Sequence, residues 1–150
     1  MVNHNHSIRP IQAQDTRPLR QQILRPHQSL ETLIYAGDDH PLSLHLGAFH
    51  HDQLVGIASV SPELYPPMPK ESAWRLRGMG TLPSVQRQGF GAALLQTAIL
   101  YIQSHHGTLL WCHGRTSALP FYRALGFIPY GDEFLSPVTG PHYLCYRVLP

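Results

Sequence analysis

Two glycines separated by one residue open the most regular amphipathic segment of the chain. Gly89 and Gly91 follow an apolar run that ends near Leu82. Apolar or small residues then recur at positions 91, 94, 95, 98, 99 and 102. That spacing is typical of one buried face of an α-helix. The pattern predicts a strand, a glycine-containing turn and a helix that stops at Gly107.

This arrangement is suited to binding an anion. Glycine has no Cβ, so backbone N–H groups can approach a ligand closely and the chain can adopt positive φ. The first N–H groups of a helix lack an internal partner and lie at the positive end of its dipole, about half an elementary charge. Arg87 stands beside the turn and can add a charge-assisted contact. These features predict a phosphate site.

Other glycine-rich phosphate motifs fit less well. A lone Gly-x-Gly is often only a tight turn. The third glycine of a dinucleotide-binding fingerprint would fall at Leu94, and no acidic residue follows about 20 positions later. A Walker loop is excluded because the chain lacks Gly-Lys-Ser/Thr here.

Two motifs in order resemble a known family. Residues 86–91 read Gln-Arg-Gln-Gly-Phe-Gly, which fits Gln/Arg-x-x-Gly-x-Gly/Ala, the pyrophosphate loop of the GCN5-related N-acetyltransferase (GNAT) superfamily. About thirty residues later, residues 118–127 read Ala-Leu-Pro-Phe-Tyr-Arg-Ala-Leu-Gly-Phe and resemble its second signature. The resemblance covers Trp74–Tyr130. It implies a mixed, mostly antiparallel sheet of six or seven strands, with helices on both faces.

The resemblance also implies the cofactor, acetyl-coenzyme A. In GNAT proteins the strand before the loop splays from its parallel neighbour, and the pantetheine arm enters the gap and bonds to strand amides. Backbone groups of Met79, Thr81 and Leu82 match that role. His113 stands where many relatives carry a cofactor-contacting asparagine, and it can donate through one ring nitrogen. The residues matched to the pyrophosphate are Gln86, Arg87, Gln88, Gly89, Phe90, Gly91 and Ala92.

Tyr122 matches the position where many relatives place a general acid near the cofactor sulfur. A phenol with a pKa of about 10 is protonated at neutral pH and can donate to a departing thiolate. Alternatively, its hydroxyl only orients the sulfur. Cys112 and Cys145 lie in apolar runs without a sequence cue for activation, so we expect buried thiols and direct transfer without a covalent enzyme intermediate.

The sequence does not identify the general base. Glu71, Glu133, His50 and His142 are candidates by residue type, and a water chain is a further alternative. Arg75 and Arg77 alternate with apolar residues on the strand before the loop. They therefore face an anionic acceptor or a carboxylate of this protein, and we favour the carboxylate.

Composition narrows the class of protein. The 150 residues fit one domain, 1–150, of α/β type. Eleven basic and nine acidic residues leave a net charge of +2, too low and scattered for a nucleic-acid partner. No apolar run reaches a membrane span, and the first residues lack a signal peptide's apolar core. Eleven histidines show no metal-ligand spacing, so we expect no metal site.

Local patterns predict the remaining elements. A helix capped by Asp15 or Thr16 should run to about Leu24, and Ser117 should cap a helix that Gly126 ends. Ala118, Phe121 and Leu125 are expected in the core. Strands are predicted at 7–12, 42–49, 53–59, 74–82, 108–112, 127–130 and 143–148, with a short helical turn near 29–35. Loops are predicted at 36–41, 61–72, 113–115 and 131–141.

The resulting hypothesis is a cytoplasmic N-acetyltransferase that moves an acetyl group from acetyl-coenzyme A to a primary amine of a small molecule or peptide. A non-catalytic acyl-coenzyme A binding module is the alternative. A structural or metal-binding protein is disfavoured by the histidine spacing. The acceptor, and the choice between monomer and homodimer, cannot be read from these residues.

Overall fold

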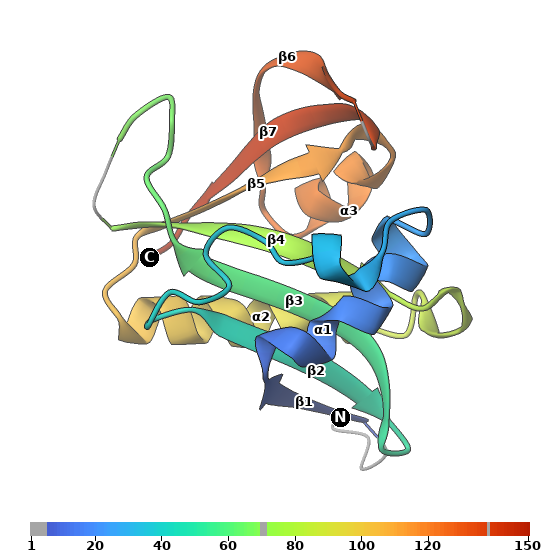
Figure 1. Ribbon diagram of the computed structural model, residues 1–150. Helices are drawn as coiled ribbons and strands as arrows, with labels where there is room; N and C mark the ends of the chain where they lie inside the picture. Colours follow the sequence, from blue (N-terminus) through green and yellow to red (C-terminus); the bar gives the residue numbers. More distant parts are fainter. Residues whose placement is uncertain (1–5, 70–71, 138) are drawn as a thin grey trace.

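The computed structural model describes residues 6–69, 72–137 and 139–150. Its centre is a seven-stranded sheet in the order β1-β2-β3-β4-β5-β7-β6 (Figure 1). This architecture is the one the GNAT resemblance implied. The strands are β1 (His6–Ile11), β2 (Leu44–His50), β3 (Gln53–Pro62), β4 (Ala73–Thr81), β5 (Leu109–Arg115), β6 (Ile128–Ser136) and β7 (Gly140–Val148).

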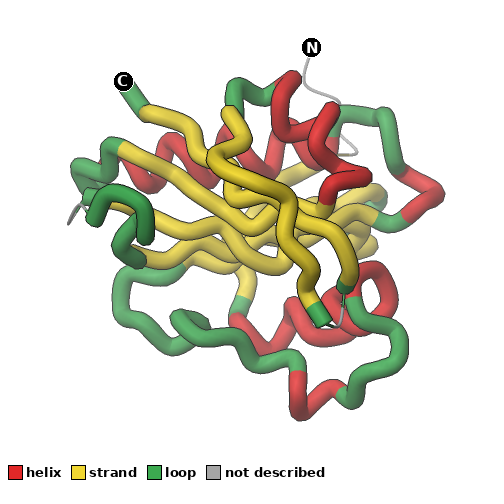
Figure 2. The backbone as a smooth tube through the Cα atoms, turned by 90° about the horizontal axis from the view of Figure 1, so that it is seen from above, coloured by secondary structure: helices red, strands yellow, loops and turns green. Residues whose placement is uncertain are grey.

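Helices cover both faces of the sheet (Figure 2). They are α1 (Ala13–Leu19), α2 (Phe90–Ser104) and α3 (Leu119–Ala124), with short helical turns η1 (Arg20–Leu24), η2 (Leu30–Thr32), η3 (Pro83–Val85) and η4 (Thr116–Ala118). The buried face of α2 is the one that the apolar spacing predicts. Its fully buried residues are Phe90, Leu94, Leu95, Ala98, Ile99 and Ile102.

The strands β4 and β5 form the parallel pair of the sheet, and they separate after three residues. Ala73–Arg75 pair with Leu109–Trp111, whereas the pairs on either side are antiparallel and longer. Beyond Arg75 the two strands diverge (Figure 1). Opposite this gap, β4 is bulged against β3, and Gly78 has φ +60. The rest of β4 therefore has an edge towards β5 with no strand paired to it in the described residues.

Two predicted loops are strands instead. Residues 113–115 continue β5, because β7 pairs with it in register from Leu109 to Arg115. Most of residues 131–141 belong to the β6–β7 hairpin, in which Phe134 is opposite His142 and Ser136 is opposite Gly140. The turn-forming residues in this stretch signal a loop locally, but pairing with β7 overrides that preference.

Helix starts and stops also differ from the local predictions. The N-cap of α1 is Gln12 rather than Asp15, and the Asp15 carboxylate accepts the Gln12 N–H at 2.9 Å. The helical conformation does continue to Leu24, as a π-helical turn. Ala118, not Ser117, caps α3, because the 3₁₀ turn η4 precedes the helix.

The end of α2 is formed by a histidine. His106 adopts φ +63, the left-handed position that the sequence suggested for Gly107. Gly107 follows it and donates its N–H to Ile102 O at 2.9 Å. A Cβ at Gly107 would lie 2.2 Å from Ile102 and 2.8 Å from Trp74, so this glycine is needed for close packing.

A buried ion pair fastens η1 and the following loop to the sheet. Arg20 donates to both carboxylate oxygens of Asp38 at 2.7 and 2.9 Å and to the Ser59 hydroxyl at 3.0 Å. His45 bonds to Ser59 and to the Asp38 carbonyl oxygen. Burial opposes ionisation of Asp38, but hydrogen bonds from Arg20 and the Tyr35 N–H outweigh it and lower its pKa. The network holds Tyr35 beside β4.

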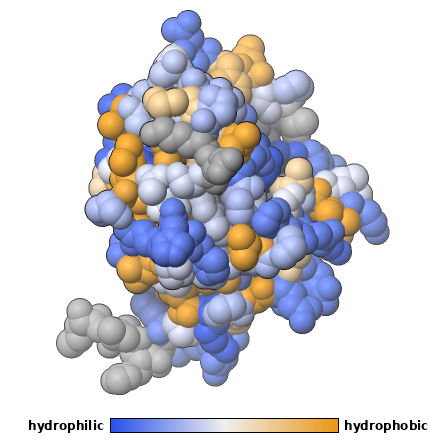
Figure 3. Space-filling model, turned by 90° about the vertical axis from the view of Figure 1, so that its left-hand side faces the viewer, coloured by the Kyte–Doolittle hydropathy of each residue, from blue (hydrophilic) through white to orange (hydrophobic). Residues whose placement is uncertain are grey.

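Apolar residues on one side of the molecule occur in small separate spots among polar ones (Figure 3). Within the described residues, no helix is both long and apolar enough to span a bilayer.

Asp38→Asn should destabilise the fold because it leaves the Arg20 guanidinium buried without its counter-charge. We expect a loss of about 3–5 kcal/mol in the free energy of unfolding at pH 7, measured by denaturant titration. Since the folded-state pKa of Asp38 is lowered, its stabilisation is present at neutral pH and disappears as the pH falls through that value. The difference in the free energy of unfolding between wild type and variant should therefore become smaller below pH about 4. The exposed Asp52→Asn is the control and should leave the midpoint unchanged.

Candidate active site

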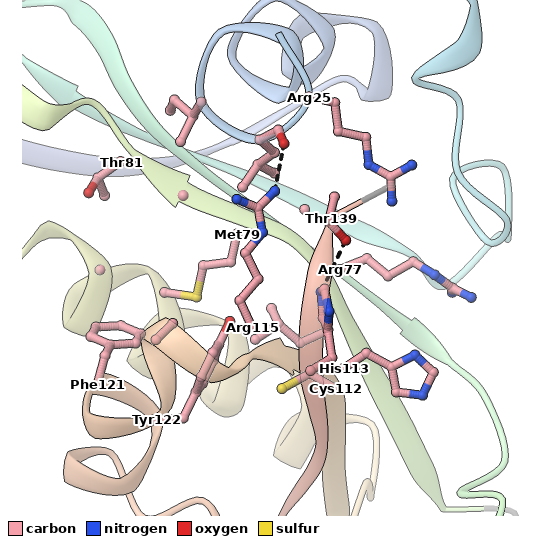
Figure 4. Close-up of a pocket in the computed structure, with 18 of the residues that line it drawn as sticks. Arg25, Arg77, Met79, Thr81, Cys112, His113, Arg115, Phe121, Tyr122 and Thr139 are labelled. Atoms are coloured by element: carbon pink, nitrogen blue, oxygen red, sulfur yellow. Dashed lines mark hydrogen bonds between the residues drawn. The ribbon is translucent and has the colours of Figure 1, made fainter. Parts of the chain in front are cut away.

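A single cleft of about 1280 Å³ follows the gap between β4 and β5 (Figure 4). The turn after β4 and the start of α2 close one end of it. The β6–β7 hairpin and the residues around η1 and η2 border the other end. α3 contributes Phe121 and Tyr122 from the α2 side of the sheet. The cleft thus joins the predicted phosphate turn to the predicted general acid.

The turn between β4 and α2 presents open backbone amides. Arg87 and Gly89 both have positive φ, +65 and +89, and Gly89 is the N-cap of α2. In the described part of the chain, the N–H groups of residues 87–92 donate to no acceptor, and the first such bond of α2 runs from Ala93 N–H to Gly89 O. A Cβ at Gly89 would meet nothing within 4 Å. The turn is therefore accessible and has the anion-binding geometry that the glycines predicted.

Most of the residues predicted to bind the cofactor line this cleft. From the turn and α2 they are Gln86, Arg87, Gly89, Phe90, Gly91 and Ala92, and from the strands they are Met79, Thr81 and His113. Gln88 does not line it; its side-chain amide donates to Ser84 O at 3.4 Å.

Leu82 is also outside the cleft. Its N–H donates to Val55 O at 2.8 Å, and its carbonyl accepts the Val85 N–H at 3.0 Å. Both backbone groups of Leu82 are already engaged within the protein. We therefore leave Leu82 out of the proposed pantetheine contacts and retain Met79 and Thr81.

Tyr122 is held rigidly from one side. Its ring packs against Phe127 at a centroid distance of 5.5 Å, and a Cβ at Gly114 would lie 3.0 Å from the ring. Its hydroxyl has no hydrogen-bond partner among the described residues. Burial, with smaller contributions from the Cys112 and Cys145 thiols, raises the pKa of Tyr122, so the phenol is protonated at neutral pH.

Phe121 is not a core residue, contrary to the sequence-based expectation. Its side chain is 37% exposed and lines the cleft beside Gly91, where a Cβ would lie 3.0 Å from its ring. The preceding 3₁₀ turn sets the phase of α3, so Tyr122 rather than Phe121 faces the core. Cys112 and Cys145 are free and buried, as predicted.

The four candidate bases lie in different places. Glu133 accepts the Thr116 hydroxyl at 2.8 Å and does not line the cleft. His50 packs against His6 and Phe90 at the β2–β3 end, also outside the cleft. Glu71 lies outside the described residues. His142 alone of the other three lines the cleft.

His142 has a defined orientation. Its Nδ1 is 2.7 Å from Gly140 O, so Nδ1 carries the proton, and Nε2 faces the Thr139 hydroxyl at 3.2 Å. The ring stacks on Phe134 at 5.8 Å. In this tautomer Nε2 is the nitrogen that can accept a proton from the cleft.

Arg75 and Arg77 both meet a carboxylate of the protein, as the sequence analysis favoured. Their guanidinium groups donate to the two oxygens of Glu63 at 3.0 and 2.8 Å. Arg75 also donates to His113 Nδ1 at 3.2 Å. Desolvation and the Arg75 charge lower the pKa of His113 to about 4, so this imidazole is neutral at pH 7.

Several cleft residues were not found from the sequence. They are Arg25, Tyr35, Arg115, Phe134 and Thr139. They come from loops, from the end of β5 and from the β6–β7 hairpin, where no local motif marks them. For the strand residues the register, such as Arg115 opposite His142, would have been the signal, and it depends on long-range pairing.

Comparison with known proteins agrees with this geometry. The model of the Acetyltransferase (GNAT) family matches residues 6–127. The chain belongs to this family, and it is an N-acetyltransferase. It is 37% identical over 142 residues to the Bacillus subtilis (strain 168) protein YitI, described as an uncharacterized N-acetyltransferase, with 95% of each chain covered. Membership of an enzyme family does not favour the alternative of a non-catalytic binding module.

Solved structures show the same fold. Ard1 from Thermoplasma volcanium has a TM-score of 0.78 at 16% identity, covering 97% of this chain and 99% of that one. The ribosomal-protein-S18-alanine N-acetyltransferase from Escherichia coli has a TM-score of 0.72 at 19% identity, covering 96% and 94%.

The neutral state of His113 can be measured directly. The Cε1–H resonance of His113 should titrate with a midpoint near pH 4 in proton NMR, because desolvation and Arg75 disfavour the imidazolium. Arg75→Met should move the midpoint up towards the ordinary value of about 6.5. A wild-type midpoint already near 6.5 would contradict the described contact.

Proposed function

We propose that the protein transfers an acetyl group from acetyl-coenzyme A to a primary amine by direct attack in a ternary complex. The observation that carries this proposal is the row of unpaired amides at residues 87–92, at one end of a cleft that reaches Tyr122 at the β4–β5 gap. We also propose a cytoplasmic location, because two free, buried thiols suit a reducing compartment.

The residues present fit such a cofactor. The space in front of Gly89 is open, and the N–H groups of residues 87–92 are oriented by the start of α2. They would hold the diphosphate, with Arg87 supplying a further charge. The free edge of β4, at Met79 and Thr81, would hold the amide-bearing arm as an additional strand. When bound, acetyl-coenzyme A supplies an activated acyl group as a thioester.

Tyr122 would protonate the departing thiolate. Its ring is fixed by Gly114 and Phe127, so its hydroxyl needs no reorganisation to donate. Because burial raises its pKa, the phenol carries its proton at every physiological pH. A pre-positioned donor of this kind contributes through general acid catalysis.

His142 would accept the proton of the amine, directly or through a water molecule. The Gly140 carbonyl fixes its tautomer and leaves Nε2 as the acceptor. The Thr139 hydroxyl donates to Ser136 Oγ at 3.1 Å and lies 3.2 Å from this nitrogen, towards which it can turn before the acceptor arrives. Of the candidate bases that the structure describes, His142 is the one that lines the cleft.

A large side chain at Gly89 should prevent cofactor binding. We expect Gly89→Leu to weaken coenzyme A binding at least about tenfold in calorimetry, since it fills the space that the diphosphate needs and removes charge-assisted hydrogen bonds. Gly131→Leu is a matched control, because Gly131 also has positive φ (+76) and open space around its Cβ. Equal affinity in both variants would count against the phosphate turn.

Tyr122→Phe should reduce kcat about 10- to 1,000-fold while leaving cofactor affinity unchanged, because only the proton donor is lost. Thiol release in steady state and calorimetry with coenzyme A measure the two quantities. The exposed Tyr130→Phe is the control and should retain full activity. A wild-type rate for Tyr122→Phe would mean that the tyrosine only packs.

A further inference from the structure

The cleft has two chemically different sides. Alternate residues of β5 point to opposite faces of the sheet. The Arg75 guanidinium lies 4.7 Å from the Trp111 ring and 3.2 Å from His113, on the face that α1 covers. Gly114 faces the other way, against the Tyr122 ring. The proton donor therefore lies on the α2 face, and the α1 face of the gap remains for the acceptor.

The acceptor side is strongly basic. The residues that line it include Arg25, Arg77 and Arg115 (Figure 4). Arg75 lines it as well, and the described lining residues include no carboxylate. Glu63, which does not line the cleft, forms ion pairs with both Arg75 and Arg77 and neutralises one positive charge at most. Three positive charges are left facing the bound amine.

Arg75 and Arg77 are too far from the phosphate turn to serve mainly the diphosphate. Arg77 precedes Thr81 by four residues, and a strand rises about 3.3 Å per residue, which gives roughly 13 Å. Arg75 is two residues further away. The positive charge near the point where β4 and β5 separate is therefore placed to bind a different anion.

Arg25 is the best placed of the four to bind that anion. Arg115 donates to Leu24 O, and the other two arginines are held by Glu63. The Arg25 guanidinium forms no hydrogen bond or ion pair with any residue that the structure describes. It lies 5.4 Å from the centroid of the Tyr35 ring, half-buried, and extends into the cleft in Figure 4. Its donors therefore have no partner within the part of the chain that the structure describes.

Resting on the proposed function, we propose that the acceptor is an amine that also carries a carboxylate or phosphate group, and that Arg25 binds this group. The basic surroundings would repel a purely cationic polyamine and attract a zwitterion or an anion. They would also favour loss of the ammonium proton, which must precede attack. A bidentate arginine contact would then aim the amine at the gap beside His142.

Matched acceptor pairs test this inference. Thiol release is measured with phenylalanine against phenethylamine and with phosphoethanolamine against ethanolamine. We expect kcat/KM to be about 10- to 100-fold higher for the member that carries the carboxylate or phosphate in at least one pair, the size of one charge-assisted contact. The pair that shows the preference distinguishes carboxylate from phosphate.

Variants locate the contact. Arg25→Gln should abolish the preference by raising KM for the acceptor that carries the carboxylate or phosphate, while leaving coenzyme A affinity unchanged. Arg25→Lys should restore part of it. Arg123→Gln, on the exposed end of α3, is the matched control and should keep the preference.

The outcomes separate the two proposals. Turnover that is equal or faster with the amines lacking a carboxylate or phosphate, or none with either amine that carries one while coenzyme A still binds, overturns the acceptor inference alone. A preference that survives Arg25→Gln overturns the assignment of Arg25. Failure to bind coenzyme A in calorimetry overturns the proposed function itself.

Discussion

The separation of β4 from β5 determines the rest of this molecule. A parallel pair that continued to the ends of both strands would satisfy every backbone group and leave no room between them. Here pairing stops at Arg75, because β5 follows β7 while β4 bends at the bulge near Gly78 and follows β3. The unpaired edge of β4 is costly unless water or a ligand satisfies it. The fold thus keeps open a slot that would suit an extended, amide-bearing molecule, such as the proposed cofactor.

Side chains on a strand point alternately to opposite faces of the sheet, so the two sides of that slot are lined by different kinds of residue. On the α2 face, small residues such as Gly114 let the Tyr122 ring approach the strand. On the α1 face, arginines and imidazoles from four different elements converge. The Arg20–Asp38 pair keeps η1 and its following loop against the sheet, and thereby holds Arg25 and Tyr35 at the cleft. Stability and the proposed acceptor recognition would therefore be linked through this buried pair.

Local sequence patterns predicted the centre of the fold and failed at its edges. The turn at Gly89 and the buried face of α2 follow from glycine conformations and helical spacing, so they can be predicted from one continuous stretch of sequence. His113 was predicted in a loop, and residues 131–141 were read as irregular, because their strand pairing depends on a partner distant in sequence. His142 was one of four equivalent candidates until that pairing brought it to the cleft. The acceptor side, including Arg25, carries no local motif and could not be predicted.

The central claim is that backbone amides after β4 bind a diphosphate. Titration of the ¹⁵N-labelled protein with coenzyme A, compared with pantetheine, which lacks the diphosphate, tests it most directly. We expect the amide resonances of residues 87–92 to shift with coenzyme A and to stay in place with pantetheine, while those of Met79 and Thr81 shift with both. Unchanged resonances at 87–92 in a protein saturated with coenzyme A would contradict the account.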